Sequence, residues 1–377
     1  MRDFLKRILK PKYEALNRIE IIGGNLIANY NYLKSQQPQA VIFPVLKSNA
    51  YGHGLKEVCR ILNTTDAPLV AVDSYPEAQI VYRYFKGKVL LLGEMPLGAY
   101  KYCKLARTEF VVYNEATLKH LARYGKKAKV HLFINSGMNR EGIKDLNSFI
   151  VKNKNYLIKV EVTGLCSHLA SAEENSLLNK EQEDKFIVAL DILHAAGFFP
   201  RWIHLGNSAA IFKLNNKLLT AYRAGLAFYG YGSSVDAKKE KQLKPALNIF
   251  SHLIAIQELE TGEAVSYNET YRASQPTKIG VIPFGYFEGL DRRLSNQAQF
   301  SVQGYQGIFS AKIAGRICMN LTCLEISNNK AEIGAEVQIV SANSQDYNSI
   351  ANLAVLSQTI PYEFLVKLQT NIRREIV

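Results

Sequence analysis

The chain has 377 residues, of which 47% are hydrophobic and 21% are charged, and both fractions are those of an ordinary globular protein. This length predicts two domains. The formal net charge is +13, but the basic residues are dispersed, and no arginine-rich tract or aromatic RNA-binding signature accompanies them. The composition therefore argues against nucleic acid as a partner. We interpret the charge as a solvated surface that also attracts anionic substrates and phosphate-bearing cofactors.

The first residues carry charges every two or three positions, so they form neither a signal-peptide core nor a membrane span. We therefore expect a cytoplasmic protein without a membrane partner. The cysteines have no pair at the spacing of metal ligands, which indicates reduced thiols and no metal site. They are Cys59, Cys103, Cys166, Cys318 and Cys323.

Eight short apolar runs rich in β-branched residues recur in the first part of the chain, and amphipathic helical patterns lie between them. The runs lie near residues 41–46, 69–72, 88–92, 110–113, 130–134, 160–165, 202–205 and 222–227. The helical patterns include residues 55–62, 76–85, 116–124 and 181–196. This alternation predicts an α/β fold with a (β/α)8 TIM barrel over residues 12–246. A doubly wound open sheet is the alternative, but no Gly-x-Gly-x-x-Gly turn follows the first run.

Beyond about residue 246 the strand-like runs are no longer separated by helical patterns. They lie near residues 249–259, 278–284, 298–302, 308–314, 321–326 and 335–340, and a helical pattern follows near 347–356. The change predicts that the barrel is followed by a mostly β C-terminal domain over residues 247–377. Residues 1–11 are candidates for packing against this second domain.

Lys47 ends the first apolar run and is followed by turn residues. A lysine at the mouth of a buried strand can lose proton affinity through desolvation, and a neutral amine is what Schiff-base chemistry with a carbonyl requires. Most lysines, however, merely solvate a surface. The interpretation of Lys47 as a catalytic amine therefore depends on the rest of the chain.

Other polar residues end the later runs, and in a barrel of this type the carboxyl ends of the strands carry the active site. These residues are Arg140, His168, His204, Ser208, Arg223 and Gly225. The loops after the seventh and eighth strands are the habitual phosphate site of the fold, because helix N-terminal N–H groups favour an anion. Together with Lys47, this loop region predicts a phosphate-bearing cofactor.

Residues 47–54, Lys-Ser-Asn-Ala-Tyr-Gly-His-Gly, resemble the pyridoxal-phosphate motif of the alanine racemase family, whose fold is a barrel plus a β domain. Eight further motifs of that family follow in order across both predicted domains. They are Ser136 to Arg140, His168 with Ala172-Glu173, His204 to Ser208, Arg223-Ala-Gly225, Val265-Ser-Tyr267, Gly285-Tyr286, Gly315 to Met319 and Ile360 to Glu363. Their order makes the resemblance specific over nearly the whole chain.

The resemblance implies a pyridoxal 5'-phosphate-dependent racemase that interconverts L-alanine and D-alanine with two bases and supplies D-alanine for peptidoglycan. Lys47 would carry the cofactor and move the α-proton on one face of the substrate, and Tyr267 would do so on the other face. Members of the family are homodimers with composite sites. Tyr267 and Met319 are therefore expected to reach the cofactor of the neighbouring subunit, with Tyr286 near the substrate entrance.

The resemblance also implies the ligands of the cofactor and of the substrate. Arg223 would face the pyridine nitrogen, with His204 orienting it, while His168 would hydrogen-bond Tyr267. Arg140 and the backbone N–H of Met319 would hold the substrate carboxylate. The expected phosphate ligands are Tyr51, Ser208, Gly225, Leu226 and Tyr362.

Two positions depart from the family pattern. Phe133 stands where many members carry a carbamylated lysine that fixes the arginine, so Arg140 is expected to be held by Asn135, by a carboxylate such as Glu141, or by a chloride ion. Asn320 follows Met319 in place of an aspartate. These changes concern substrate preference and turnover more than the fold.

Three other functions stay open at this point. Tyr362 favours a small substrate because its phenol crowds the β-carbon, and a serine-preferring or broad-specificity racemase is the nearest alternative. A non-catalytic pyridoxal-phosphate-binding protein would lack the β domain. A decarboxylase of related plan would carry a paired cysteine and aspartate motif there.

Overall fold

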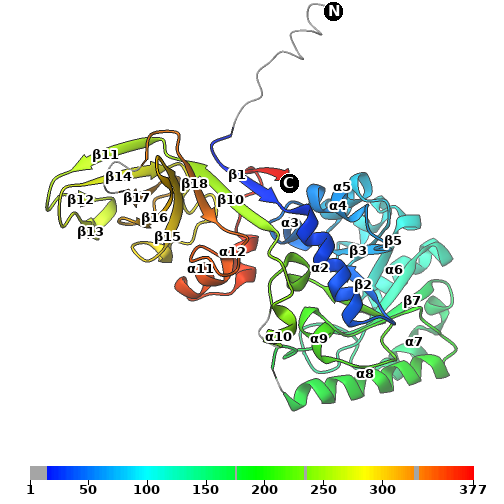
Figure 1. Ribbon diagram of the computed structural model, residues 1–377. Coiled ribbons are helices and arrows are strands. Elements are labelled where there is room, and N and C mark those ends of the chain that lie inside the picture. Colours follow the sequence, from blue (N-terminus) through cyan, green and yellow to red (C-terminus); the bar gives the residue numbers. More distant parts are fainter. Residues whose placement is uncertain (1–14, 175, 233–235, 327–330) are drawn as a thin grey trace, which may run out of the picture.

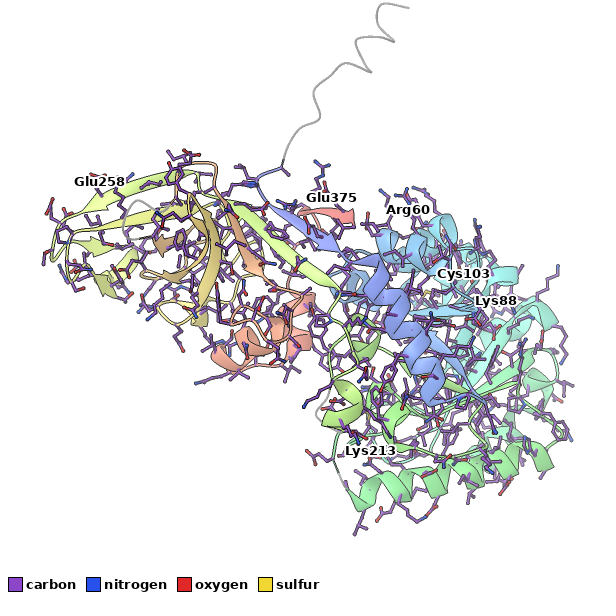
Figure 2. All side chains as sticks on the ribbon, viewed as in Figure 1. Arg60, Lys88, Cys103, Lys213, Glu258 and Glu375 are labelled. Atoms are coloured by element: carbon purple, nitrogen blue, oxygen red, sulfur yellow. The ribbon has the colours of Figure 1, made fainter. Side chains whose placement is uncertain are left out.

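The computed structural model describes residues 15–174, 176–232, 236–326 and 331–377. It consists of two lobes, a barrel and a β-rich lobe, and the segments that connect them lie at the centre of Figure 1. Figure 2 places Lys88 in the barrel lobe and Glu258 at the far end of the other lobe. Residues 1–11, for which packing against the second domain was considered, lie outside the described residues. No helix in the described ranges is both long and apolar enough to cross a membrane.

The first lobe contains eight parallel strands, as predicted. They are β2 (Val41–Pro44), β3 (Leu69–Val72), β4 (Lys88–Leu91), β5 (Thr108–Val112), β6 (Lys129–Phe133), β7 (Glu161–Cys166), β8 (Trp202–His204) and β9 (Ala221–Ala224). Strands β3 to β8 pair in chain order, and β2 pairs with β9. The Val45–Ala71 bridge joins β2 to β3, and a 3.0 Å bond from Arg223 N to Gly206 O joins β9 to β8. The barrel is thereby closed, and the open-sheet alternative is wrong.

Helices cover the outside of the barrel (Figure 1). They are α2 (Gly23–Gln36), α4 (Leu55–Leu62), α5 (Tyr75–Tyr84), α6 (Glu115–Leu121), α7 (Leu146–Leu157), α8 (Leu177–Ala195), α9 (Ser208–Lys213) and the short α10 (Ala237–Glu240). Capping side chains fix several starts, since Asn114 accepts from Thr117 N and Asp145 accepts from Ser148 N. The helix predicted over residues 116–124 ends earlier, because the chain passes into a 3₁₀ segment, η3 (Ala122–Lys127). The connection from β4 to β5 contains 3₁₀ turns η1 (Leu97–Tyr102) and η2 (Leu105–Arg107).

The second lobe is built on a nine-stranded sheet with the order β11-β14-β17-β16-β15-β18-β10-β1-β19. The strands predicted for it are β14 (Thr277–Ile282), β15 (Gln299–Gly304), β16 (Gly307–Ile313), β17 (Thr322–Glu325) and β18 (Glu336–Val340). The run predicted at residues 249–259 forms two strands instead of one. They are β10 (Leu247–His252) and β11 (Ala255–Leu259), which lie in different parts of the sheet. A two-stranded ribbon of β12 (Ala264–Val265) and β13 (Tyr271–Arg272) accompanies the sheet.

Two strands of this sheet come from distant parts of the chain. Strand β1 (Arg18–Ile21) pairs antiparallel with β10 and parallel with β19 (Arg373–Ile376). It buries Ile19 and Ile21 and leaves the alternating charged residues, Arg18 and Glu20, partly exposed. Residues 12–246 were expected to form the barrel, yet β1 within that range belongs to the large sheet. A division between residues 246 and 247 otherwise stays a prediction.

Two helices follow the last strands of the second lobe, and the second of them contacts the barrel. Helix α11 (Ile350–Leu356) begins after Ser349, whose side chain accepts from Asn352 N, so the helix predicted near 347–356 is shorter. Helix α12 (Pro361–Val366) follows and starts with a proline, which suits the first turn of a helix. Because α12 contacts α3, it places Tyr362 at the mouth of the barrel.

Candidate active site

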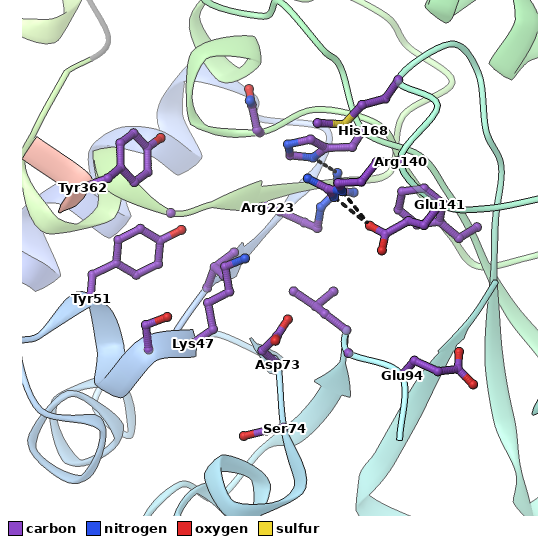
Figure 3. Close-up of a pocket in the computed structure, with 18 of the residues that line it drawn as sticks. Lys47, Tyr51, Asp73, Ser74, Glu94, Arg140, Glu141, His168, Arg223 and Tyr362 are labelled. Atoms are coloured by element: carbon purple, nitrogen blue, oxygen red, sulfur yellow. Dashed lines mark hydrogen bonds and ion pairs between the residues drawn. The ribbon is translucent and has the colours of Figure 1, made fainter. Parts of the chain in front are cut away.

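A cavity of about 1120 Å³ lies at the carboxyl ends of the barrel strands. Lys47, Tyr51 and Tyr362 lie on one side of it, and Arg140 and His168 lie across from them, as Figure 3 shows. Arg223, Ser208 and Gly225 also line this cavity. The structure therefore brings together most of the side chains that the barrel rule selected from the sequence.

Lys47 follows β2 and begins a tight turn, α3 (Lys47–Tyr51). The backbone of Ser48, Asn49 and Ala50 is left-handed, with φ of 55°, 55° and 54°. Such a conformation costs roughly 1–2 kcal/mol per non-glycine residue. The turn is held by a bond from Leu55 N to Asn49 Oδ1 at 2.9 Å, among others. This strained turn fixes the position from which the Lys47 side chain enters the cavity.

Arg223 is a buried guanidinium on β9 that faces the cavity. Its Nη1 donates to His204 Nδ1 at 2.6 Å, and its Nη2 donates to Ser167 O at 2.6 Å and to His168 Nδ1 at 3.2 Å. No carboxylate of the described ranges forms an ion pair with it. Burial lowers the pKa of Arg223, and a ligand with negative charge or a lone pair would compensate this isolated cation.

His168 lies near three positively charged side chains. Burial, together with the charges of Arg223, Arg140 and Lys47, lowers the pKa of His168 to about 3. The imidazole is therefore neutral near pH 7. Its Nδ1 accepts a hydrogen bond from Arg223, because a guanidinium can only donate.

A cradle of hydroxyls and backbone amides lies between β8, β9 and α12. Ser208 Oγ accepts from Gly225 N at 2.9 Å and from Ala227 N at 3.3 Å. A Cβ atom at Gly225 would lie 2.6 Å from Tyr51 Oη, so only glycine leaves this space open. Burial raises the pKa of Tyr51, and burial followed by the charge of Glu173 raises that of Tyr362 to about 12. Both phenols therefore keep their protons and can donate to an anion.

Two predicted cofactor ligands do not line the cavity themselves. His204 is fully buried beneath Arg223 and contacts the site through it. Leu226 is also buried and begins the 3₁₀ turn η4 (Leu226–Tyr229), so only its backbone is suited to a ligand.

Arg140 lies on an exposed loop after β6 and forms an ion pair with its neighbour Glu141. Glu141 Oε1 lies 2.7 Å from Arg140 Nη2 and 3.1 Å from Nε (Figure 3). Glu141 thus contacts the guanidinium, whereas Asn135 accepts from the backbone N of Gly137 and Asn139 and shapes the loop. Phe133 is buried, and its ring packs against Tyr113 with centroids 4.9 Å apart.

Tyr267, Tyr286 and Met319 lie outside this cavity, on the β-rich lobe. Their exposed fractions are 64%, 43% and 56%. Their loops adjoin one another, because Tyr286 N donates to Cys318 O at 3.1 Å and Ser266 Oγ donates to Arg316 O at 2.6 Å. Within one chain these three residues therefore form an exposed surface that is separate from Lys47.

Sequence reasoning missed several polar residues of the cavity. Asp73 follows β3 and Glu94 lies near the end of β4, and both line the cavity. Because they also lie beyond the carboxyl ends of strands, the rule that selected Arg140 could have found them.

The cavity fits pyridoxal phosphate in three respects. It offers one lysine amine and a buried guanidinium without a carboxylate partner. It also offers a cradle of phenol and backbone donors, whose space a Cβ atom at Gly225 would fill. A barrel with such a lysine after its first strand, followed by a β domain, is the plan of the fold-type III pyridoxal-phosphate enzymes.

Comparisons with known proteins narrow the class further. The family model described as alanine racemase, N-terminal domain, matches residues 22–233, and that of the C-terminal domain matches residues 246–376. The chain belongs to the alanine racemase family.

Individual proteins agree with this assignment. An alanine racemase of Borreliella burgdorferi is 33% identical over 93% of this chain and 95% of its own length. A structure of an alanine racemase from Clostridium difficile 630 superposes with a TM-score of 0.86 at 28% identity, over 97% of each chain. A structure from Streptomyces coelicolor shares the fold with a TM-score of 0.88 at 24% identity, over 96% of this chain and 98% of that one.

Proposed function

We propose that this protein is a pyridoxal-phosphate-dependent racemase that interconverts L-alanine and D-alanine in the cytoplasm and supplies D-alanine for peptidoglycan. The convergence of Lys47, Arg223 and the phosphate cradle in one cavity of an alanine-racemase-family chain carries the proposal. Bound pyridoxal phosphate supplies an electron sink for the charge left when the α-proton is removed.

The chain's own residues would divide the work by position. The amine of Lys47 binds the cofactor and moves the proton on one face of Cα. Tyr51, Ser208, Gly225, Leu226 and Tyr362 hold the phosphate through hydroxyls and backbone amides. Arg223, oriented by His204, faces the pyridine nitrogen and keeps its own protons, since a guanidinium is charged at all physiological pH values. That cation restrains delocalisation into the ring and favours return of the proton to Cα.

Racemisation also needs a base on the opposite face, because one base returns a proton only to the face from which it came. We assign this role to Tyr267 of a second subunit, with His168 as the hydrogen-bond partner of its hydroxyl. Arg140 and the backbone N–H of the partner subunit's Met319 would hold the substrate carboxylate, and Tyr286 would lie at the entrance. The exposure of Tyr267, Tyr286 and Met319 on one surface supports a homodimer with composite sites.

Mixing two inactive variants tests the composite site. Lys47→Ala is expected to lose the absorbance of lysine-bound cofactor and all racemisation, and Tyr267→Ala is expected to keep the cofactor and lose most racemisation. Co-refolded in equal amounts, they should form mixed dimers with one intact site each and recover about one quarter of wild-type activity. No recovery would place both bases in one chain. Full activity of either single variant would contradict the assignment of the bases.

Substrate preference is tested separately with L-alanine, L-serine and L-lysine, by following the loss of optical rotation. Because Tyr362 crowds the space near the β-carbon, we expect alanine to react fastest. A faster reaction of serine would favour the alternative of a serine-preferring racemase. No reaction of any of the three would contradict the proposed function.

A further inference from the structure

A continuous chain of buried hydrogen bonds leads from the cavity into the interior of the barrel. Arg223 on β9 bonds His204 on β8, and His204 Nε2 lies 2.7 Å from His131 Nδ1 on β6. His131 Nε2 in turn lies 2.9 Å from Glu109 Oε2 on β5. All four residues are at most 7% exposed. Only the first two belong to the site described above.

The direction of every bond in this relay of Arg223, His204, His131 and Glu109 follows from one fact, that a guanidinium has donors and no acceptor. Arg223 Nη1 therefore donates to Nδ1 of His204, which must carry a lone pair there. A neutral His204 then has its proton on Nε2 and donates it to His131 Nδ1. His131 is consequently neutral as well, with its proton on Nε2 directed at the carboxylate of Glu109. A charged imidazole at His131 would leave His204 with no proton at all.

The charges at the two ends are complementary. Burial favours neutral Glu109, but the hydrogen bond from His131 and the hydrogen bond and charge of Lys88 outweigh it and hold the pKa of Glu109 below its ordinary value. Thr163 Oγ1 donates to the same carboxylate at 3.0 Å. Burial and the charge of Arg223 lower the pKa of His204 well below its ordinary value, which agrees with a neutral ring. The buried cation and the buried anion are thus joined through two neutral imidazoles.

The barrel interior is shaped for this arrangement. Gly164 on β7 lies beside the His131 ring, and a Cβ atom there would approach His131 Cγ to 2.3 Å. The absence of a side chain at this position gives His131 the space it needs to reach both His204 and Glu109.

We propose that Glu109 and His131 are positioning residues for Arg223. They hold His204 in the tautomer that accepts from Arg223, and the carboxylate of Glu109, which also forms an ion pair with Lys88 at 3.0 Å, anchors the far end of the relay. This inference rests on the proposed function for its effect on turnover. The relay itself is a property of the folded chain and can be measured without substrate.

The first test determines the tautomers in the unaltered protein by nitrogen-15 NMR of the labelled imidazoles. Signals are assigned with the His131→Gln and His204→Gln variants. We expect both rings to be neutral, with the proton on Nε2, at pH 7. A proton on Nδ1 of either ring, or a cationic ring, would overturn the proposal.

The second test replaces the carboxylate by Glu109→Gln. Since the amide oxygen accepts without a charge, the hydrogen bond from His131 Nε2 is weakened, and the signals of both His131 and His204 should shift. Unchanged signals of His204 would show that Glu109 has only a structural role. Val130→Ala, which opens a cavity at a buried position of the same strand without removing a relay bond, is the control and should leave both signals in place.

Turnover gives the third readout. In Glu109→Gln we expect kcat for alanine to fall about tenfold, with KM changed less than about twofold, because the relay acts on Arg223 and not on the substrate carboxylate. Unchanged kcat, or a loss confined to KM, would overturn the positioning role. A wild-type protein with the expected tautomers but no racemisation would support the relay and contradict the proposed function.

Discussion

Arg140 receives its counter-charge from the next residue in the chain. The carboxylate of Glu141 contacts two nitrogens of the guanidinium, while Phe133 occupies the position from which many family members supply a charge. Both side chains of the pair are well exposed, at 54% and 37%. The support of the arginine is thus an exposed ion pair, which water and salt weaken.

Replacing Glu141 by glutamine should therefore have a measurable but modest effect on substrate binding. An exposed ion pair contributes up to about 1 kcal/mol, which corresponds to a rise in KM for alanine of up to about fivefold with little change in kcat. Steady-state kinetics at low and at high salt measure it, and the difference should shrink at high salt. Glu115→Gln removes a surface ion pair with Lys119 away from the cavity and is the control. An unchanged KM in Glu141→Gln at low salt would contradict this role.

Single residues at the strand ends could be predicted from the sequence, because the fold itself makes those positions converge. The relay could not. Glu109 directly precedes one apolar run and His131 lies inside another, and nothing local shows that side chains 22 residues apart meet in the barrel interior. Tyr267 and Met319 likewise do not meet Lys47 within one chain. Their role in the active site therefore stays a prediction.

At the scale of elements, the turn from β9 into η4 is the most restricted part of the phosphate cradle. We expect Gly225→Ala to weaken binding of pyridoxal phosphate by about tenfold or more, because the new Cβ would meet Tyr51 Oη. Fluorescence titration of the cofactor-free protein measures the change. Gly98→Ala is the control, since a Cβ there meets nothing within 4 Å. Equal affinities of the two variants would contradict the assignment of Gly225.

The elements of the barrel were predictable because buried parallel strands are continuous apolar runs, and all eight lie at the expected places. The strands of the large sheet were harder to predict from the sequence. Strands β1 and β19 are four residues long and mix charged with apolar side chains, so their sequences resemble loops. Pairing with distant parts of the chain makes them strands: β1 pairs with β10 and β19, and β19 pairs with β1.

At the scale of the whole molecule, buried neutral histidines make stability depend on pH. Burial lowers the pKa of His53 to about 4, against a value of 6.5 in the unfolded chain. The unfolded state therefore binds more protons between these values, and stability that is present above pH 6.5 is lost as the pH falls toward 4. His168 adds to the same trend.

Urea unfolding at pH 7.5 and pH 5 tests this dependence. The wild-type protein should be less stable at pH 5, and His53→Gln should reduce the difference between the two pH values by about 2 kcal/mol. Gln79→Ala, at an exposed position on α5, removes no titratable group and should leave the difference unchanged. A wild-type protein equally stable at both pH values would show that these histidines do not remain neutral when folded.

The place of β1 has a consequence for dividing the molecule. Between β1 and β10 the chain makes the entire barrel, so the barrel is an insertion within the large sheet, and two cuts of the chain are needed to separate the lobes. A fragment that starts at residue 246 would lack β1, which lies between β10 and β19. It would leave one edge of β10 open and β19 without a neighbour, and such unpaired edges promote aggregation. The large sheet of the β-rich lobe is thus complete only when β1 is present.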